Sequence, residues 1–223
     1  MSDDCTNNWQ TNWFLDGEIA KVENTEKGMH LQAGPEFGND AHHMVLWTKK
    51  SFHGDVKIEF DYTRTDEETK AVNILYIQAT GKEEGEFVKD ISHWNHLRTV
   101  PSMRTYFNNM KTLHISFAAF PNNEETKDYI RVRRYPVLPD KGFRELEVEP
   151  TFFDTGLFKS GETYMVTVIK TDGRLYFQII GKEKSKVYSW DTSHLPPIKE
   201  GRIGLRHMYT RSAIYSNFKI WTK

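Results

Sequence analysis

An uninterrupted alternation of polar and apolar residues limits what this chain can fold into. In the segment Asp55–Thr63, Val56, Ile58, Phe60 and Tyr62 occupy every second position, and charged residues stand between them. Side chains of a β-strand point to opposite faces in turn, so this period of two predicts a strand with one face in a hydrophobic core. The other face is expected to meet water.

The same pattern recurs along the chain, with turn residues between the strands. The Asp-Gly pair within Thr171–Arg174 predicts a hairpin turn of type I′, because these residues tolerate positive φ. Many short strands with little helix are typical of a sandwich or barrel. We predict an all-β, two-sheet antiparallel β-sandwich of the jelly-roll type, with residues 1–223 as a single domain. The further predicted strands are Val72–Thr80, Thr112–Phe120, Tyr129–Tyr135, Tyr164–Thr171, Leu175–Gly181, Lys186–Trp190, Gly201–Met208 and Ala213–Trp221.

One segment, Gly81–Lys111, departs from this pattern. It is too long for an ordinary hairpin loop, and a short helix is predicted near Glu86–Arg98 because apolar residues recur there at helical spacing. A long insertion on a rigid β scaffold often carries function, whereas a helix that plugs one end of the sandwich would be structural, and both interpretations stay open. The apolar residues are Phe87, Ile91, Trp94 and Leu97.

Charge and cysteine content exclude some classes of protein. The net charge is −1, so the chain lacks the overall basic field that nucleic acid binding requires. The longest apolar stretches, such as 115–120, are far shorter than the roughly 20 residues that cross a bilayer. Residues 1–10 are polar and acidic, unlike a secretory signal, and Cys5 is the only cysteine. We expect a cytoplasmic protein that binds neither nucleic acid nor a membrane.

The strand Tyr129–Tyr135 has the most unusual composition. Its aliphatic residues are expected to face the core, which places Tyr129, Arg131, Arg133 and Tyr135 together on the other face. Arginine binds carboxylates through two parallel hydrogen bonds, and aromatic rings offer stacking surfaces for sugars. This face is a candidate site for an acidic sugar. The alternative is a solvated strand face, which is the usual situation of charges on an exposed sheet.

Other strands are expected to add polar groups to this site. His114, Tyr76 and Gln78 all fall on the side of their strands that is opposite to the predicted core. A structural, hydrogen-bonded histidine is the alternative for His114. The candidate catalytic residues are His114, Tyr76 and Arg131, and the candidate substrate-binding residues are Gln78, Arg133, Tyr129, Tyr135, Trp94, Glu59 and Asp61.

Glu59 and Asp61 form a carboxylate pair on one strand face, roughly 6–7 Å apart along the strand. Paired carboxylates can act as general acid and nucleophile in glycoside hydrolysis, although an ordinary polar face is the favoured interpretation. No cofactor or catalytic metal is predicted. A structural calcium ion on the outside of the sandwich is an alternative, and its candidate ligands are Asp16, Glu18 and Asn217.

Two segments resemble a known superfamily. Leu46–Tyr62, with the sequence LWTKKSFHGDVKIEFDY, is similar to the early strand pair of concanavalin-A-like lectin and glucanase domains. Gly201–Trp221, with the sequence GRIGLRHMYTRSAIYSNFKIW, is similar to their closing strand pair. With the chain length, these segments resemble the bacterial YesU family within that superfamily. The resemblance implies a galectin-like sandwich and a setting in the use of plant cell-wall polysaccharide of the pectin type.

The chain departs from two catalytic patterns of the superfamily. Family-16 glycoside hydrolases carry Glu-x-Asp-x-x-Glu on one strand, and here Glu59 and Asp61 match but the third position is Arg64. The alginate-lyase relatives use Gln-x-His, whereas Gln78 is followed by Ala79 and Thr80. The resemblance therefore supplies no catalytic residues.

Three functions stay open. The first is an enzyme acting on an acidic oligosaccharide. As a lyase, it would neutralise the uronate carboxylate with arginine and remove the neighbouring proton with His or Tyr; as a hydrolase, it would use Glu59 and Asp61. The second is a lectin-like protein that binds an oligosaccharide without cleaving it. The third is an interaction module that pairs with another protein, and the oligomeric state is open as well.

Overall fold

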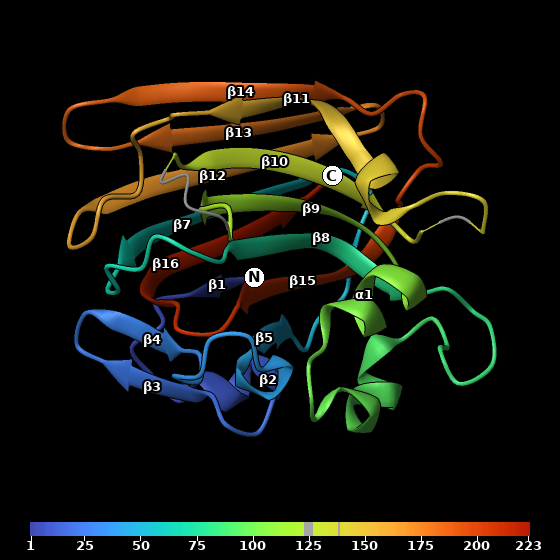
Figure 1. Ribbon diagram of the computed structural model, residues 1–223, viewed down its shortest axis with the longest axis horizontal. Helices are drawn as coiled ribbons and strands as arrows, with labels where there is room; N and C mark the ends of the chain where they lie inside the picture. Colours follow the sequence, from blue (N-terminus) through green and yellow to red (C-terminus); the bar gives the residue numbers. More distant parts are fainter. Residues whose placement is uncertain (123–126, 138) are drawn as a thin grey trace.

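The computed structural model of the protein describes residues 1–122, 127–137 and 139–223. Two antiparallel sheets lie one in front of the other (Figure 1). The prediction of a two-sheet antiparallel β-sandwich is confirmed.

The first sheet lies at the back in Figure 1 and the second sheet at the front. The first sheet contains, in spatial order, β14 (Ser185–Asp191), β13 (Arg174–Ile180), β12 (Thr163–Thr171), β7 (Val56–Arg64), β16 (Ser212–Thr222), β4 (Gly28–Gln32) and β3 (Lys21–Thr25), with β1 (Ser2–Asp3) paired to β16. The second sheet contains β11 (Glu147–Phe153), β10 (Tyr129–Tyr135), β9 (Met110–Ala119), β8 (Asn73–Gly81), β15 (Glu200–His207), β5 (Met44–Thr48) and β2 (Trp13–Asp16), with β6 (Phe52–His53) paired to β15.

Every strand that the alternation predicts is present, as β7 to β10 and β12 to β16, with ends within two residues of those predicted. The early strands and β11 were not predicted.

The turn between β12 and β13 has two residues, since Thr171 pairs with Arg174. Of these two residues, only Gly173 has a left-handed φ, of +95°. A type I′ turn needs positive φ at both central residues, so the predicted turn type is wrong.

The main hydrophobic core fills the space between the two sheets. It takes alternate residues from each strand, such as Ile58 and Phe60 of β7 and Leu113 and Ile115 of β9. We call the side of a sheet that faces this core its inner face and the opposite side its outer face.

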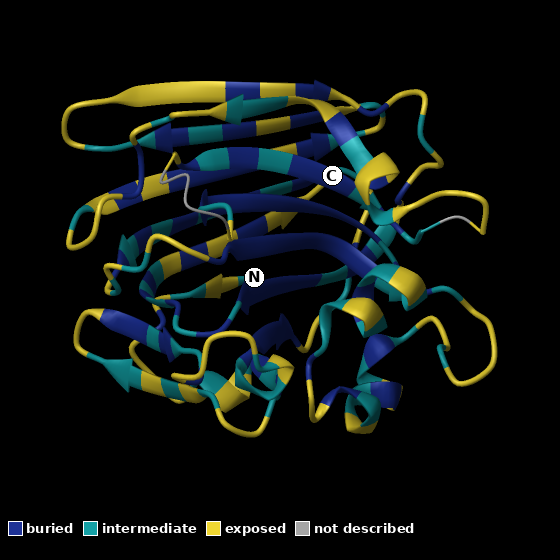
Figure 2. Ribbon diagram, viewed as in Figure 1, coloured by how far each residue is buried: buried dark blue, intermediate teal, exposed yellow. Residues whose placement is uncertain are grey.

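The outer faces of the two sheets differ in burial. Along β13, buried residues alternate with more exposed ones, whereas nearly every residue of β8 and β9 is buried (Figure 2). Strands that are buried on both faces need a second layer of apolar contacts. The outer face of the second sheet is therefore covered over its central strands.

The insertion supplies this cover. It forms the 3-10 helix η3 (Ile91–Arg98) and the helix α1 (Met103–Asn109), which lie at one corner of the second sheet (Figure 1). A second hydrophobic cluster joins Trp94 and Tyr106 of the insertion to Trp47 and Tyr76 of the sheet. The remaining 3-10 helices are η1 (Trp9–Thr11), η2 (Asp40–His42) and η4 (Phe143–Leu146).

The helix predicted near Glu86–Arg98 is confirmed in part. Helical structure begins only at Ile91, where the Asp90 carboxylate caps it by accepting from the Ser92 backbone N–H at 2.9 Å. The helix is of the 3-10 type and is interrupted at Trp94, whose φ of −120° and ψ of 29° are not helical.

Candidate functional site

Three adjacent strands of the second sheet bring predicted polar residues into neighbouring positions. Tyr76 of β8 pairs with His114 of β9, and His114 pairs with Arg133 of β10. Two residues along β9, Ser116 pairs with Arg131. Directly paired residues of adjacent strands point to the same face. Both arginines, His114 and Tyr76 therefore share the outer face, as strand parity predicts.

This row of residues extends across most of the sheet. Gly204 of β15 pairs with both Tyr76 and Trp47, and Glu147 of β11 pairs with Arg133. A Cβ atom at Gly204 would lie 2.4 Å from Cζ3 of Trp47, so only glycine lets the indole lie across β15. There the indole stacks on Tyr76, with ring centroids 5.3 Å apart.

Asp16 fastens the insertion to this face. Its fully buried carboxylate accepts hydrogen bonds from Nε1 of Trp47 at 2.7 Å and from the hydroxyl of Tyr106 at 2.8 Å. It also accepts from Nε of Arg98 at 2.5 Å and from Nδ2 of Asn95 at 2.6 Å. The insertion is thus held to the sheet by a charged centre as well as by apolar packing.

The cover buries two of the three predicted catalytic residues, whereas the third, Arg131, reaches solvent. Tyr76 and His114 are both 0% exposed, and so is Tyr135. Burial, with a smaller contribution from the Arg133 and Arg206 cations, holds the pKa of His114 well below its usual value, so the imidazole is neutral. Among the residues that the structure describes, neither ring nitrogen of His114 has a hydrogen-bond partner, and the hydroxyls of Tyr76 and Tyr135 also lack one.

A neutral imidazole is the form that a general base requires, but these groups have no contact with solvent while the insertion is in place. The structure thus brings together His114, Tyr76 and Tyr135 in one cluster and separates that cluster from the surface. Their ring centroids lie 4.8 Å (His114 to Tyr135) and 5.8 Å (His114 to Tyr76) apart.

A buried cation, Arg206, lies next to this cluster. It is 0% exposed, and its Nη2 donates to the carbonyl oxygen of Pro101 at 2.5 Å and contacts Nδ1 of His43 at 2.7 Å. Burial, followed by the charge of Arg206, lowers the pKa of His43 to about 2, so His43 accepts this hydrogen bond as a neutral ring. Within the described part of the chain, Arg206 forms no ion pair with a carboxylate.

The row reaches solvent at the arginine patch, which we define as Tyr129, Arg131, Arg133, Glu147 and Thr151 and in which Arg133 is itself only 8% exposed. Nε of Arg131 lies 3.0 Å from a Glu147 carboxylate oxygen and donates to the Thr151 hydroxyl at 3.1 Å. Nη2 of Arg133 lies 3.6 Å from the same Glu147 oxygen. The side chains of Arg131 and Glu147 are each 19% exposed, so solvent reaches this end of the row.

Aromatic rings frame the arginine patch. The guanidinium carbon of Arg131 lies 4.7 Å from the ring centroid of Tyr129, and that of Arg133 lies 4.6 Å from the ring of Phe143. Phe153, which pairs with Tyr129 across β10 and β11, is 60% exposed. Stacked, planar guanidinium groups have few orientations and are therefore preorganised for a planar anion. The patch combines two such cations, one carboxylate and an exposed ring.

Besides the buried Tyr135, two more predicted binding residues, Gln78 and Trp94, lie near the second sheet but do not join the patch. Gln78 has a left-handed φ of +53° at a bulge in β8, and its Nε2 donates to the carbonyl oxygens of Phe52 and Gly54, both at 3.0 Å. Trp94 is 1% exposed and donates from Nε1 to the carbonyl oxygen of Val88 at 3.0 Å. Both side chains serve the scaffold, so neither is placed to contact a sugar in this arrangement.

The carboxylate pair lies elsewhere in the molecule. Glu59 and Asp61 are on the outer face of β7 in the first sheet, on the opposite side of the sandwich from the arginine patch. Glu59 pairs with Lys57 at 2.6 Å, and Asp61 accepts from Nδ2 of Asn217 at 2.7 Å. The two carboxylates therefore cannot share a site with His114, and their contacts are those of an ordinary polar face.

The proposed calcium ligands are also separated. Asp16 belongs to β2 of the second sheet and forms an ion pair with Arg98, whereas Asn217 belongs to β16 of the first sheet. Asp16 and Asn217 are therefore not brought together as ligands of a common calcium ion. Across residues 1–122, 127–137 and 139–223, no three His, Cys, Asp or Glu side chains are grouped so as to hold a metal ion.

The contributors to this face that were not predicted from the sequence include Trp47, Glu147, Thr151 and Arg206. A signal for Glu147 was present, since Glu147, Val148 and Glu149 alternate as a half-buried strand does. Arg206 had the same signal, since it alternates with the core residues Ile203 and Leu205 in the predicted strand Gly201–Met208. Trp47 carries no such local signal, because its role depends on partners far away in the sequence.

The fold defines the class of protein: a two-sheet antiparallel β-sandwich of the galectin-like and legume-lectin-like type. The chain belongs to the family described as "Domain of unknown function (DUF1961)", which matches residues 5–220. No curated protein is significantly similar in sequence. Among the described residues, none of the helices has the length and apolar character needed to cross a membrane.

Solved structures show the same fold at low sequence identity. A Bacillus subtilis protein of unknown function with a galectin-like fold is 18% identical, with a TM-score of 0.72, covering 99% of this chain and 94% of the other. The exoplasmic/lumenal domain of VIP36, in a form bound to Ca2+ and Man3GlcNAc, is 13% identical with a TM-score of 0.61, covering 96% and 85%. The carbohydrate-binding module CBM66 from Bacillus subtilis is 12% identical with a TM-score of 0.54, covering 95% and 96%.

Proposed function

We propose that the protein binds an acidic oligosaccharide, of the uronate-containing pectin type, at the arginine patch, and that it does so without cleaving the sugar chain. One observation carries this proposal: Arg131 and Arg133 share a single carboxylate, Glu147. Counted over the five residues of the patch alone, one unit of positive charge is therefore in excess, and a ligand carboxylate would neutralise it.

The surroundings of the two arginines suit a sugar acid. A guanidinium group can bind a carboxylate through two parallel hydrogen bonds. The exposed ring of Phe153 offers an apolar surface next to this charge. Two structures with the same fold, a VIP36 domain bound to Man3GlcNAc and the module CBM66, are carbohydrate-binding proteins by their descriptions, which supports a sugar as the ligand.

Cleavage as a lyase is a second candidate function, and one observation favours it. Polar groups without partners cluster at catalytic sites, and His114, Tyr76 and Tyr135 are such a cluster. This function requires that the insertion leave the outer face of the second sheet, because the cluster is fully buried beneath it. Binding needs no such movement and is therefore the primary proposal. The cytoplasmic location expected from the sequence stays a prediction.

Calorimetry combined with absorbance separates the two functions. The protein is titrated with oligogalacturonides, and the same mixture is followed for the ultraviolet absorbance of an unsaturated product. Saturable heat without new absorbance is the expected result. A rise in absorbance would support the lyase instead, and an absence of both signals across a panel of acidic oligosaccharides would contradict the proposal.

A further inference from the structure

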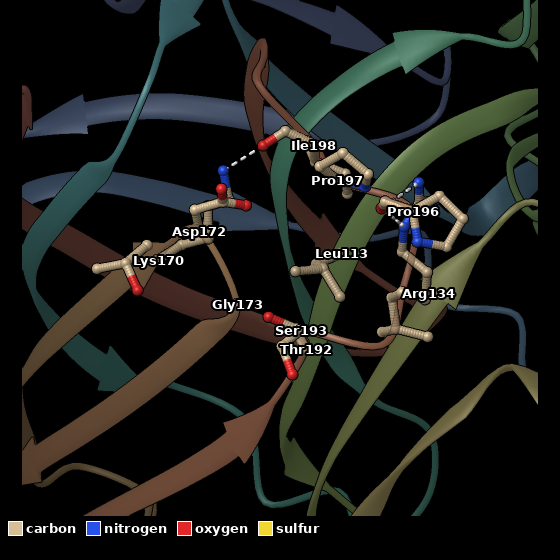
Figure 3. Close-up of a pocket in the computed structure, with 12 residues that line it drawn as sticks. Leu113, Arg134, Lys170, Asp172, Gly173, Thr192, Ser193, Pro196, Pro197 and Ile198 are labelled. Atoms are coloured by element: carbon tan, nitrogen blue, oxygen red, sulfur yellow. Dashed lines mark hydrogen bonds between the residues drawn. The ribbon is translucent and has the colours of Figure 1, made fainter.

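A separate pocket lies at one end of the sandwich, near the ends of β10 and β12 (Figure 3). Its volume is about 180 Å³. Residues 192–198 close it on one side, and its apolar wall consists of Leu113, Leu195, Pro196, Pro197 and Ile198. A cavity of roughly 150 Å³ accommodates a molecule of the size of benzene, so this pocket has room for a small organic molecule.

Strand parity separates this pocket from the arginine patch. Arg134 pairs with Leu113, which belongs to the core between the sheets, whereas Arg133 pairs with His114 on the outer face. Arg134 therefore points away from its two neighbouring arginines in the sequence. The second cation of the pocket, Lys170, comes from β12 in the first sheet.

Arg134 and Lys170 each donate hydrogen bonds to a backbone carbonyl group. Nε and Nη2 of Arg134 donate to the carbonyl oxygen of Pro196 at 3.3 and 3.2 Å, and Nζ of Lys170 donates to the carbonyl oxygen of Ile198. These carbonyl groups are two residues apart in one segment, and Figure 3 shows the two cationic groups reaching that segment at different points. The pocket therefore has a positive group at each of two separated positions.

Neither cation has a carboxylate partner within ion-pair distance among the described residues. Lys170 is only 5% exposed, whereas Arg134 is half-buried. Burial lowers the pKa of Arg134 to about 10. Burial also lowers the pKa of Lys170, and the negative charges of Asp55 and Asp172 offset part of this decrease. Carbonyl oxygens stabilise a buried cation but do not neutralise it, and buried charges in proteins are as a rule paired.

We propose that this pocket binds a small organic dicarboxylate, with one carboxylate at Lys170 and the other at Arg134. The carbon chain of the ligand lies against Leu113 and Pro197. The Thr192 hydroxyl also lines the pocket and can donate to a carboxylate. Asp172 lies on the exposed rim, where water screens its charge. This site goes beyond the proposed oligosaccharide site and does not depend on it.

Isothermal titration with dicarboxylates of increasing length tests the proposal: malonate, succinate and adipate, with acetate and butyrate as monocarboxylate probes. We expect at least one dicarboxylate to bind saturably and about tenfold or more tightly than either monocarboxylate. The variants Lys170→Met and Arg134→Gln are each expected to lose that preference. Lys186→Met, at an exposed lysine of β14, is the matched control and is expected to bind as the wild type does.

Thermal unfolding of each variant separates a loss of folding from a loss of ligand binding, because Lys170→Met also removes the hydrogen bond to the Ile198 carbonyl oxygen. The proposal is overturned if no dicarboxylate binds, if monocarboxylates bind equally well, or if Lys170→Met retains the preference. The variant Arg131→Gln changes the arginine patch and not this pocket, so it is expected to bind the dicarboxylate as the wild type does. A failure of oligosaccharide binding at the patch would therefore leave the dicarboxylate result unchanged.

Discussion

Asp16 and Arg98 form an ion pair in which both side chains are 0% exposed, with Nε and Oδ2 2.5 Å apart. The two residues are 82 positions apart in the sequence. One belongs to an edge strand of the second sheet and the other ends η3, so this contact ties the insertion to the sandwich. The burial of Tyr76 and His114 depends on the insertion staying in this position.

Substitution Asp16→Asn is therefore expected to destabilise the protein strongly. It leaves the Arg98 guanidinium buried without a counter-charge, and breaking a buried pair in this way typically costs about 3–5 kcal/mol. Urea unfolding measures the loss in the free energy of unfolding. Glu18→Gln, at an exposed acidic residue close by, is the control and should change that free energy by less than about 0.5 kcal/mol. Equal stabilities of the two variants would disprove the role of the pair.

Gly204 is expected to tolerate no side chain. A Cβ atom there would lie 2.4 and 2.5 Å from two atoms of the Trp47 ring, so Gly204→Ala must displace the indole and should lower the free energy of unfolding by about 1–3 kcal/mol. The comparison is Gly142→Ala, where an added Cβ meets nothing within 4 Å. A neutral Gly204→Ala variant would show that the Trp47 stack is not fixed.

Stability is expected to fall when the pH drops below about 6.5. Burial lowers the pKa of His114 well below 6.5, that of His207 to about 3 and that of His43 to about 2. The unfolded chain binds a proton at each of these residues below pH 6.5 and the folded chain does not, so the free energy of unfolding decreases as the pH falls. Each residue contributes up to about 1.4 kcal/mol per pH unit.

The variant His114→Gln tests this contribution. Between pH 6.5 and pH 5, before most carboxylates titrate, the slope of the free energy of unfolding against pH should be smaller for the variant than for the wild type. His194→Gln, at an exposed histidine, should keep the wild-type slope. An unchanged slope in His114→Gln would mean that His114 reaches water and binds a proton in the folded protein.

The fold was predictable because its signal is local. The alternation at Asp55–Thr63 sets the inner and outer faces of β7, and the same parity correctly places His114 and Arg133 on one face. The sequence could not show that this face is covered, because the cover depends on the contact of Asp16 with Arg98 across the chain.

Two errors have local causes. Gln78 leaves the predicted face because a bulge with a left-handed φ interrupts the period of two in β8. The strand β11 was missed although Glu147, Val148 and Glu149 alternate, because Pro150 interrupts the run and proline is unfavourable inside a strand. The arginine patch was therefore predicted without Glu147, the carboxylate on which its charge balance depends.

The excess positive charge of the arginine patch is tested most directly by comparing one sugar in two charge states. The affinities for an oligogalacturonide and for its neutral methyl ester are measured by calorimetry with the wild type and with Arg131→Gln. We predict that the wild type prefers the acidic sugar by about tenfold or more, which is about 1.4 kcal/mol, and that Arg131→Gln removes this preference while its affinity for the ester stays the same. Equal wild-type affinities for the two sugars, or an acidic preference that survives in Arg131→Gln, would contradict the account.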